Sequence, residues 1–217
     1  MNTDAVKLEE FLKKWQTENN SNKLLLLNKF NVTELPFIPY FVSQLVISNM
    51  PLRFLPPMGH FLTYLNISNL SITKLPYLPN SITVLKISQC PNLEYIRNFP
   101  SNLRKLTIYS TAICGLPDFP PKLEQFYCDD NPIEILPILP KTLRRFKCSC
   151  PLLVKHNPTE TIRQFNARQL HYIEENLSLE RIIIRTSKIK NELHTYVKEN
   201  KKGLLRFLLQ QKESTVW

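Results

Sequence analysis

Cys148, Cys150 and His156 are the nearest approach to a metal-binding cluster in this sequence. Thiolates and imidazoles are the ligands that zinc prefers, but a structural zinc site usually has four that converge on one point. The hydrophobic pattern predicts that Cys148 faces inward and that Cys150 belongs to a turn, so we expect these side chains to diverge. The sequence therefore predicts no metal ligands and no cofactor.

Catalytic chemistry is not indicated either. The histidines are scattered, with no cysteine or acid at a spacing that would activate a nucleophile, at His60, His156, His171 and His194. No glycine-rich phosphate loop is present. We therefore expect no catalytic residues and a protein that is not an enzyme.

Basic, aromatic and polar residues recur at matching positions along the chain and could form a binding surface. The candidates for partner binding are Tyr64, Asn66, Lys86, Lys105, Tyr109, Tyr127, Asp129, Arg145 and Lys147. Each lies next to inward-facing apolar residues of a predicted strand, so all would share the outward face of one sheet. Exposed tyrosines with arginine are typical of protein interfaces. The alternative is that the lysines and arginines only keep an exposed sheet soluble.

These candidates lie in copies of one short segment. Six segments begin with an apolar residue, at positions 42, 62, 82, 103, 123 and 143, and most end in Leu-Pro-x-apolar-Pro. A period of 20 or 21 residues indicates a solenoid in which each repeat contacts only its neighbours. In the second copy, Leu65 and Ile67 alternate with polar residues, which predicts a strand. Pro76 and Pro79 would then hold the return segment near polyproline II geometry.

The pattern divides the chain into three predicted parts: an N-terminal helical cap at 1–21, a solenoid of about nine repeats at 22–190, and a C-terminal helical cap at 191–217. The N-terminal cap is indicated by apolar residues at helical spacing, Leu8, Phe11, Leu12 and Trp15. Residues 159–177 fit two predictions. Ile162, Phe165 and Ala167 match an eighth strand, whereas the wider apolar spacing matches a helix, and we favour the repeat. It would add Gln164, Asn166 and Arg168 to the outward face.

The segment LPYLPNSITVLKIS, residues 75–88, resembles the short, proline-punctuated branch of the leucine-rich repeat family. Two groups share this punctuation, the bacterial effector type and the FNIP-type repeats of amoebae and giant viruses. The resemblance implies an α/β solenoid, a curved leucine-rich repeat stack with a parallel concave β-sheet, a polyproline II-like convex side and helical caps at both ends. The asparagine that usually follows each strand in the family is matched by Asn131, whereas Asn49 and Asn69 lie one residue earlier.

Some bacterial members of the family also carry a ubiquitin-ligase domain with a catalytic Cys-x-Asp. Cys128-Asp129-Asp130 matches that string, but Cys128 falls at an inward strand position where other repeats have isoleucine. We therefore do not expect a ligase. Cys128 and Cys148 are predicted to be small core residues in neighbouring strands, and a disulfide between them is the alternative.

The net charge of +10 points to an acidic partner. The expected function is a non-enzymatic protein–protein interaction scaffold that binds an acidic protein segment on the concave face, and the family resemblance makes a host-interaction factor of a pathogen or virus plausible. The alternative is binding of nucleic acid or an anionic surface through the basic C-terminal half of that face. A third possibility is an adaptor that works through its terminal helices.

The expected location is the cytoplasm, or the host cytoplasm or nucleus for a pathogen or viral protein. The first 16 residues contain acids and lack an apolar core, unlike a secretory signal, and no apolar stretch is long enough to span a membrane. Five cysteines in such a compartment are expected to be thiols rather than a disulfide framework.

Overall fold

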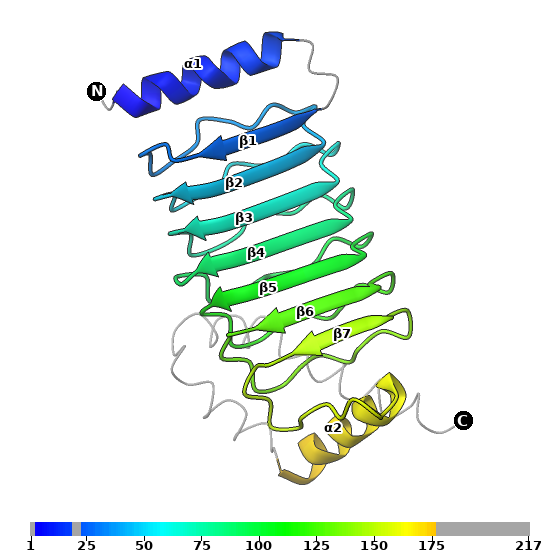
Figure 1. The fold of residues 1–217 in the computed structure, drawn as a ribbon. Helices are drawn as coiled ribbons and strands as arrows, with labels where there is room; N and C mark the ends of the chain where they lie inside the picture. Colours follow the sequence, from blue (N-terminus) through cyan, green and yellow to red (C-terminus); the bar gives the residue numbers. More distant parts are fainter. Residues whose placement is uncertain (1–2, 19–22, 177–217) are drawn as a thin grey trace. The chain divides into compact units, whose positions relative to one another are not determined.

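The computed structural model describes residues 3–18 and 23–176, and the chain divides into two compact units, residues 1–169 and 170–217. All strands among the described residues lie in the first unit (Figure 1). The elements are α1 (Thr3–Thr17), β1 (Leu24–Asn28), β2 (Gln44–Met50), β3 (Tyr64–Leu70), β4 (Val84–Cys90), β5 (Lys105–Thr111), β6 (Gln125–Asp129), β7 (Arg145–Cys148) and α2 (Ile162–Asn176).

The strands form one parallel sheet in which every strand pairs with the next along the chain, in the order β1 to β7. The register is in phase with the sequence period, since Leu45 pairs with Leu65 and Leu65 pairs with Leu85. Between strands the chain returns through segments that are neither helix nor strand. The predicted solenoid is therefore confirmed (Figure 1).

The core lies between the sheet and the return segments. Two side chains of each central strand point into it and are fully buried, as Leu65 and Ile67 are in β3. Ile72, on the return segment of the same coil, is also fully buried. Burial of branched aliphatic side chains from successive coils holds the stack together, because one coil alone has no second layer to pack against.

Each of the strands β1 to β6 has a residue with left-handed backbone geometry at or next to its end. These residues are Lys29, Asn49, Asn69, Gln89, Ser110 and Asp130, with φ between 51° and 62°. Asparagine tolerates this conformation better than most residues. The amide of Asn69 donates to the side-chain oxygen of Asn49 at 2.9 Å, and Asn49 donates to Asn28 at 3.0 Å. The asparagines that lie one residue earlier than expected thus form their own ladder, on the outside of the turn.

Helix α1 lies beside β1 at the N-terminal end of the sheet (Figure 1). Leu8 and Leu12 are fully buried, and the Trp15 ring stacks on Phe41 with 5.4 Å between centroids. Phe11, placed on the buried side by its spacing, instead remains 38% exposed and contacts Phe30 at 6.1 Å. The helix covers apolar side chains at the start of the stack, as predicted.

The eighth repeat that we favoured for residues 159–177 is wrong, because residues 162–176 of this segment form helix α2. Thr161 and Gln164 make a reciprocal capping box: the Gln164 side-chain oxygen accepts from the Thr161 N–H at 2.8 Å, and the Thr161 hydroxyl accepts from the Gln164 N–H at 3.3 Å. Phe165 and Gln169, one turn apart, are both buried. The capping box was visible in the sequence and would have predicted the helix.

Aromatic side chains connect the last strands to the start of α2. Phe126 of β6 and Phe146 of β7 stack with 5.8 Å between centroids, and Phe146 lies 6.0 Å from Phe165. The Gln169 amide donates to the Leu136 carbonyl at 2.7 Å, in place of a further strand. The predicted ninth repeat, residues 179–189, and the C-terminal cap, 191–217, lie outside the described residues.

Candidate binding surface and cysteine cluster

Strand side chains that point away from the core form what we call the outer sheet face. The register arranges them in three rows that cross the strands. The first row is Leu24, Gln44, Tyr64, Val84, Lys105, Gln125 and Arg145, and the second is Leu26, Val46, Asn66, Lys86, Thr107, Tyr127 and Lys147. The third is Asn28, Ser48, Ser68, Ser88, Tyr109 and Asp129. All nine predicted partner-binding residues lie on this face.

Two lysine–tyrosine contacts repeat the same diagonal step across neighbouring strands. The Lys86 ammonium lies 5.6 Å from the centre of the Tyr64 ring, and the Lys105 ammonium lies 5.7 Å from the centre of the Tyr127 ring. Both distances are within the range of a cation–π interaction. Each contact holds a flat aromatic surface beside a positive charge.

Tyr109 is the most exposed of the three tyrosines, at 45%. It pairs in register with Asp129 on β6, and Asp129 lies 4.0 Å from the Lys147 ammonium. The Asp129 carboxylate also accepts hydrogen bonds from the Ser149 backbone N–H and hydroxyl. The single acid of this face is thus already engaged, which leaves the surface with a net positive charge.

The other cations of the face have no acidic partner within residues 3–18 and 23–176, since no ion pair there involves Lys86, Lys105 or Arg145. Toward the N-terminal end the face changes character, because Leu26 is exposed and Val46 follows it in the same row. The described face therefore runs from apolar at β1 to basic at β7.

The three residues that an eighth strand would have added to this face lie on α2. The Asn166 amide bonds the Leu139 carbonyl at 2.9 Å, and Arg168 pairs with Glu160 at 2.6 Å. Gln164 is the capping residue of the helix. Their placement on the binding face was wrong, because the eighth strand does not form.

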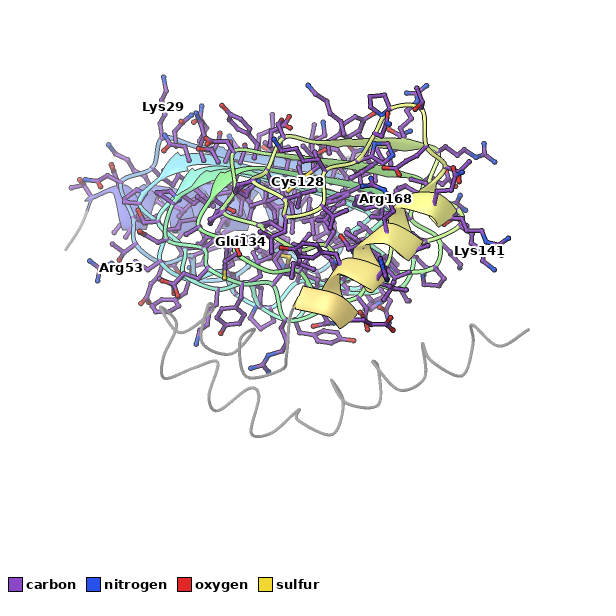
Figure 2. All side chains as sticks on the ribbon, turned by 90° about the horizontal axis from the view of Figure 1, so that it is seen from below. Lys29, Arg53, Cys128, Glu134, Lys141 and Arg168 are labelled. Carbon is purple, nitrogen blue, oxygen red and sulfur yellow. The ribbon has the colours of Figure 1, made fainter. Side chains whose placement is uncertain are left out.

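A second group of reactive side chains lies inside the coil. Cys128 and Cys148 pair in register on β6 and β7, and the sulfurs of Cys128, Cys148 and Cys150 all lie within 4.8 Å of one another. The Cys128 and Cys150 sulfurs are 3.3 Å apart. Figure 2 shows Cys128 among the side chains enclosed by the coil, while Lys29, Arg53 and Lys141 point outward. We call these three cysteines the cysteine cluster.

Cys150 joins this cluster because the seventh turn departs from the repeat. One period earlier, Asp130 is exposed and left-handed, with φ of 55°. Cys150 does not share that left-handed φ and is buried. The Leu152 N–H bonds the Cys150 carbonyl at 2.8 Å, which tightens the turn. The prediction that the Cys148 and Cys150 side chains diverge was wrong, because the Cys150 side chain points back from the turn toward Cys128.

Within the cysteine cluster the pKa of Cys150 is lowered, whereas the pKa values of Cys128 and Cys148 are raised. Hydrogen bonding to Cys148 and Cys150, together with burial, raises the pKa of Cys128. Hydrogen bonding from Cys128 and Cys148, with a contribution from Asn131, lowers the pKa of Cys150. The Asn131 amide donates to the Cys128 sulfur at 3.4 Å, to the Ile108 carbonyl at 3.2 Å and to the Asp129 carbonyl at 2.7 Å.

The structure also shows where two motifs of the sequence lie, the Cys-Asp-Asp string that begins at Cys128 and the grouping of Cys148 and Cys150 with His156. Cys128, the first residue of the ligase-like Cys-Asp-Asp string, is 0% exposed, so no external substrate reaches its sulfur. His156 is not part of the cysteine cluster. Its ring packs against Phe146 and Phe165, and its Nε2 is buried with no hydrogen-bond partner among the described residues.

Comparisons with known proteins identify the fold. No protein-family model matches the sequence, and no curated protein matches it. Among solved structures, the chain is similar to YopM from Yersinia enterocolitica WA-314, with 29% identity over 55% of this chain and a TM-score of 0.52. It is also similar to YopM from Yersinia pestis, a leucine-rich effector protein, with 19% identity over 76% of this chain and a TM-score of 0.51.

The chain spans 26% of the first of these structures and 58% of the second. No helix among the described residues combines the length and the apolar character needed to cross a membrane.

Proposed function

Because the chain folds as a leucine-rich repeat solenoid like that of bacterial effector proteins, we propose that it is a non-enzymatic scaffold that binds another protein. The partner contributes an acidic segment, and the outer sheet face of β3 to β7 binds it. The observation that carries the proposal is the paired arrangement of lysine and tyrosine on that face, Lys86 with Tyr64 and Lys105 with Tyr127.

Folding alone gives no reason for tyrosines at these positions. A sheet face that only needs solubility is served by short polar residues, as at Ser48, Ser68 and Ser88 in the third row. Tyr109 interrupts that row of serines with a large exposed ring. Tyrosine supplies much contact area at low cost in side-chain entropy, which is why it is enriched in binding sites.

The spacing of the cations indicates what the partner presents. Lys105 and Arg145 lie two strands apart in the first row, which corresponds to about 10 Å across a sheet. An extended peptide advances about 3.3 Å per residue, so carboxylates about three residues apart along a strand-crossing segment would reach both cations. The apolar residues of β1 and β2 would contact a hydrophobic end of the same segment.

By likeness to the effector from Yersinia pestis, we extend the proposal to a pathogen factor that binds a host protein, with the host cytoplasm as the place of action. The predicted nucleic-acid alternative would use the same cations to neutralise phosphates. It lacks a specific observation of its own, because the basic residues follow the rows of the sheet rather than a known nucleic-acid binding module.

The test is a triple variant, Tyr109→Ala with Tyr127→Ala and Arg145→Ala. Its matched control is Tyr77→Ala with Tyr95→Ala and Arg97→Ala, which removes the same residue types from exposed positions on the return segments. Partners captured from lysate, and a fluorescent glutamate-rich peptide, should be lost with the first variant and kept with the second. An unchanged partner set for a folded triple variant contradicts the proposed surface.

A salt titration with a single-stranded oligonucleotide distinguishes nucleic-acid binding from the proposed protein-binding function. The scaffold proposal expects weak binding at low salt that does not compete with the captured protein. Tight binding with a steep linear loss of log affinity against log salt would instead identify a nucleic-acid binding protein.

A further inference from the structure

We propose that Cys128, Cys148 and Cys150 bind one thiophilic metal ion, Zn²⁺ or Cu⁺, through their three sulfurs. The ligand chemistry common to both ions is a soft, closed-shell centre that prefers thiolate. The site is separate from the outer sheet face, so the proposal does not depend on the scaffold function.

The first argument is the geometry of the sulfurs. Three thiolates bound to one ion at about 2.3 Å each lie about 3.8 Å apart. The three sulfurs of the cluster already lie within 4.8 Å of one another, and Cys128 and Cys150 are 3.3 Å apart. Small side-chain rotations therefore bring them to ligand distance. Two of the three stand on paired strands, which fixes their backbones before any ion arrives.

The second argument compares the cluster with an ordinary buried cysteine of the same chain. Cys90 ends β4 at the register position of Thr111, where other repeats have Met50 and Leu70, and it is fully buried there. A space-filling role explains Cys90. Cys150 fills the matching buried position of the seventh coil, two residues before the buried Leu152. Unlike Cys90, it lies 3.3 Å, sulfur to sulfur, from a second cysteine, Cys128.

The third argument is the ligand set. The cysteine cluster is the only group of three or more histidine, cysteine or acidic side chains among the described residues that could hold a metal ion. All of its donor atoms are sulfur. Sulfur donors select against Mg²⁺ and Ca²⁺, which take oxygen ligands. The Asn131 amide, which donates to the Cys128 sulfur at 3.4 Å, is a second-layer group that would stabilise a bound thiolate.

Binding is balanced by proton release. Each thiol that ligates the ion loses its proton to solvent, so one Zn²⁺ or Cu⁺ displaces up to three protons and no oxidant or reductant is consumed. Cys148 is the partly exposed member of the cluster and gives the ion its path from solvent.

The experiment uses the full chain, treated with a chelator and kept reduced with a phosphine. Titration with Co²⁺ should give a thiolate-to-metal charge-transfer band that saturates at one equivalent and disappears when Zn²⁺ is added. A competition with a chromophoric Cu⁺ chelator measures the second ion, and comparison of the two arms assigns the preferred one. Metal content after dialysis should be one ion per chain.

The variants are Cys148→Ser and the double variant Cys148→Ser with Cys150→Ser, with Cys90→Ser and Cys114→Ser as controls. We expect at least a 100-fold loss of affinity in the first two and none in the controls. Far-UV circular dichroism on each variant confirms that the coil is intact, and Cys148 is chosen because its partial exposure makes substitution mild.

Two outcomes overturn the proposal. One is that the reduced wild-type chain takes up neither ion at one equivalent. The other is that the folded double variant binds metal as tightly as the wild type, which would place the ligands elsewhere.

Discussion

The Lys105 ammonium lies 5.7 Å from the centre of the Tyr127 ring, on the neighbouring strand and two residues further along it. Two strands earlier the same step leads from Tyr64 to Lys86, so there the tyrosine and the lysine have exchanged places. The solenoid thus repeats a surface contact as well as a fold. The repeat of 20 or 21 residues makes this possible, because it returns each outward position to the same row of the sheet.

The Lys105–Tyr127 contact should show a measurable but small coupling energy. In a double-mutant cycle with Lys105→Ala and Tyr127→Leu, we expect about 0.5–1 kcal/mol, since the pair is partly exposed. The measurement is the free energy of unfolding by urea for the wild type, both single variants and the double variant. The control cycle uses Lys74→Ala, on a return segment, in place of Lys105→Ala. There the effects of the two substitutions on the free energy of unfolding should add to within about 0.5 kcal/mol. Equal coupling in both cycles would contradict a direct contact.

Asn131 should contribute more to stability than any exposed asparagine. Its side-chain oxygen accepts from the Thr111 N–H at 3.0 Å and from the Thr111 hydroxyl at 2.6 Å, in the buried interior. Asn131→Ala leaves these donors without a partner, at about 1–3 kcal/mol for each buried group. Denaturant unfolding measures the loss. Asn92→Ala, at an exposed position, should change stability by no more than about 0.5 kcal/mol, and a similar loss at both sites would contradict the buried network.

Gln89 should be improved by glycine. It is exposed and held at φ of 52°, a conformation that costs a side chain about 1–2 kcal/mol. Gln89→Gly removes that strain and loses some chain entropy, so we expect a net gain of up to about 1 kcal/mol. The matched control is Gln44→Gly, an exposed glutamine in β2, which should lose about 0.5–1 kcal/mol. Melting temperatures that move in the same direction for both variants would show that the turn is not strained.

Gly59 and Gly115, neither of which has a positive φ, should respond differently to replacement by alanine. A Cβ at Gly59 would meet the backbone oxygen of Tyr40 at 2.2 Å, whereas a Cβ at Gly115 meets nothing within 4 Å. Gly59→Ala must shift the backbone of the neighbouring coil, so we expect a loss of more than about 1 kcal/mol. Gly115→Ala should be neutral or stabilising by about 0.4–1 kcal/mol. The measurement is the midpoint of thermal unfolding, and equal midpoints would contradict the close packing at Gly59.

The solenoid could be predicted from the sequence, because the evidence for it is local and repeated. Apolar residues or cysteines recur at the offsets of Leu65 and Ile67 in every clear copy, so each copy independently predicts the same strand and the same inward face. The outer sheet face followed from the alternation of side chains along a strand, which is why Tyr64, Tyr109 and Tyr127 could be placed on one surface in advance. Binding by that surface remains a prediction.

The segment after β7 could not be predicted in the same way, because its structure depends on contacts between residues distant in the sequence. The strand pattern at Phe165 and Ala167 competed with a capping box at Thr161 and Gln164, and the helix formed because its buried face packs against Phe146 and caps the open stack. The same irregularity decided the cysteine cluster. The position of Cys150 in the period predicts an exposed turn residue, but the seventh turn lacks the left-handed residue of the earlier turns, so the Cys150 side chain is buried beside Cys128. Contacts between repeats can be predicted from each repeat segment separately. Contacts after the last strand of the sheet depend instead on which residues distant in the sequence pack there.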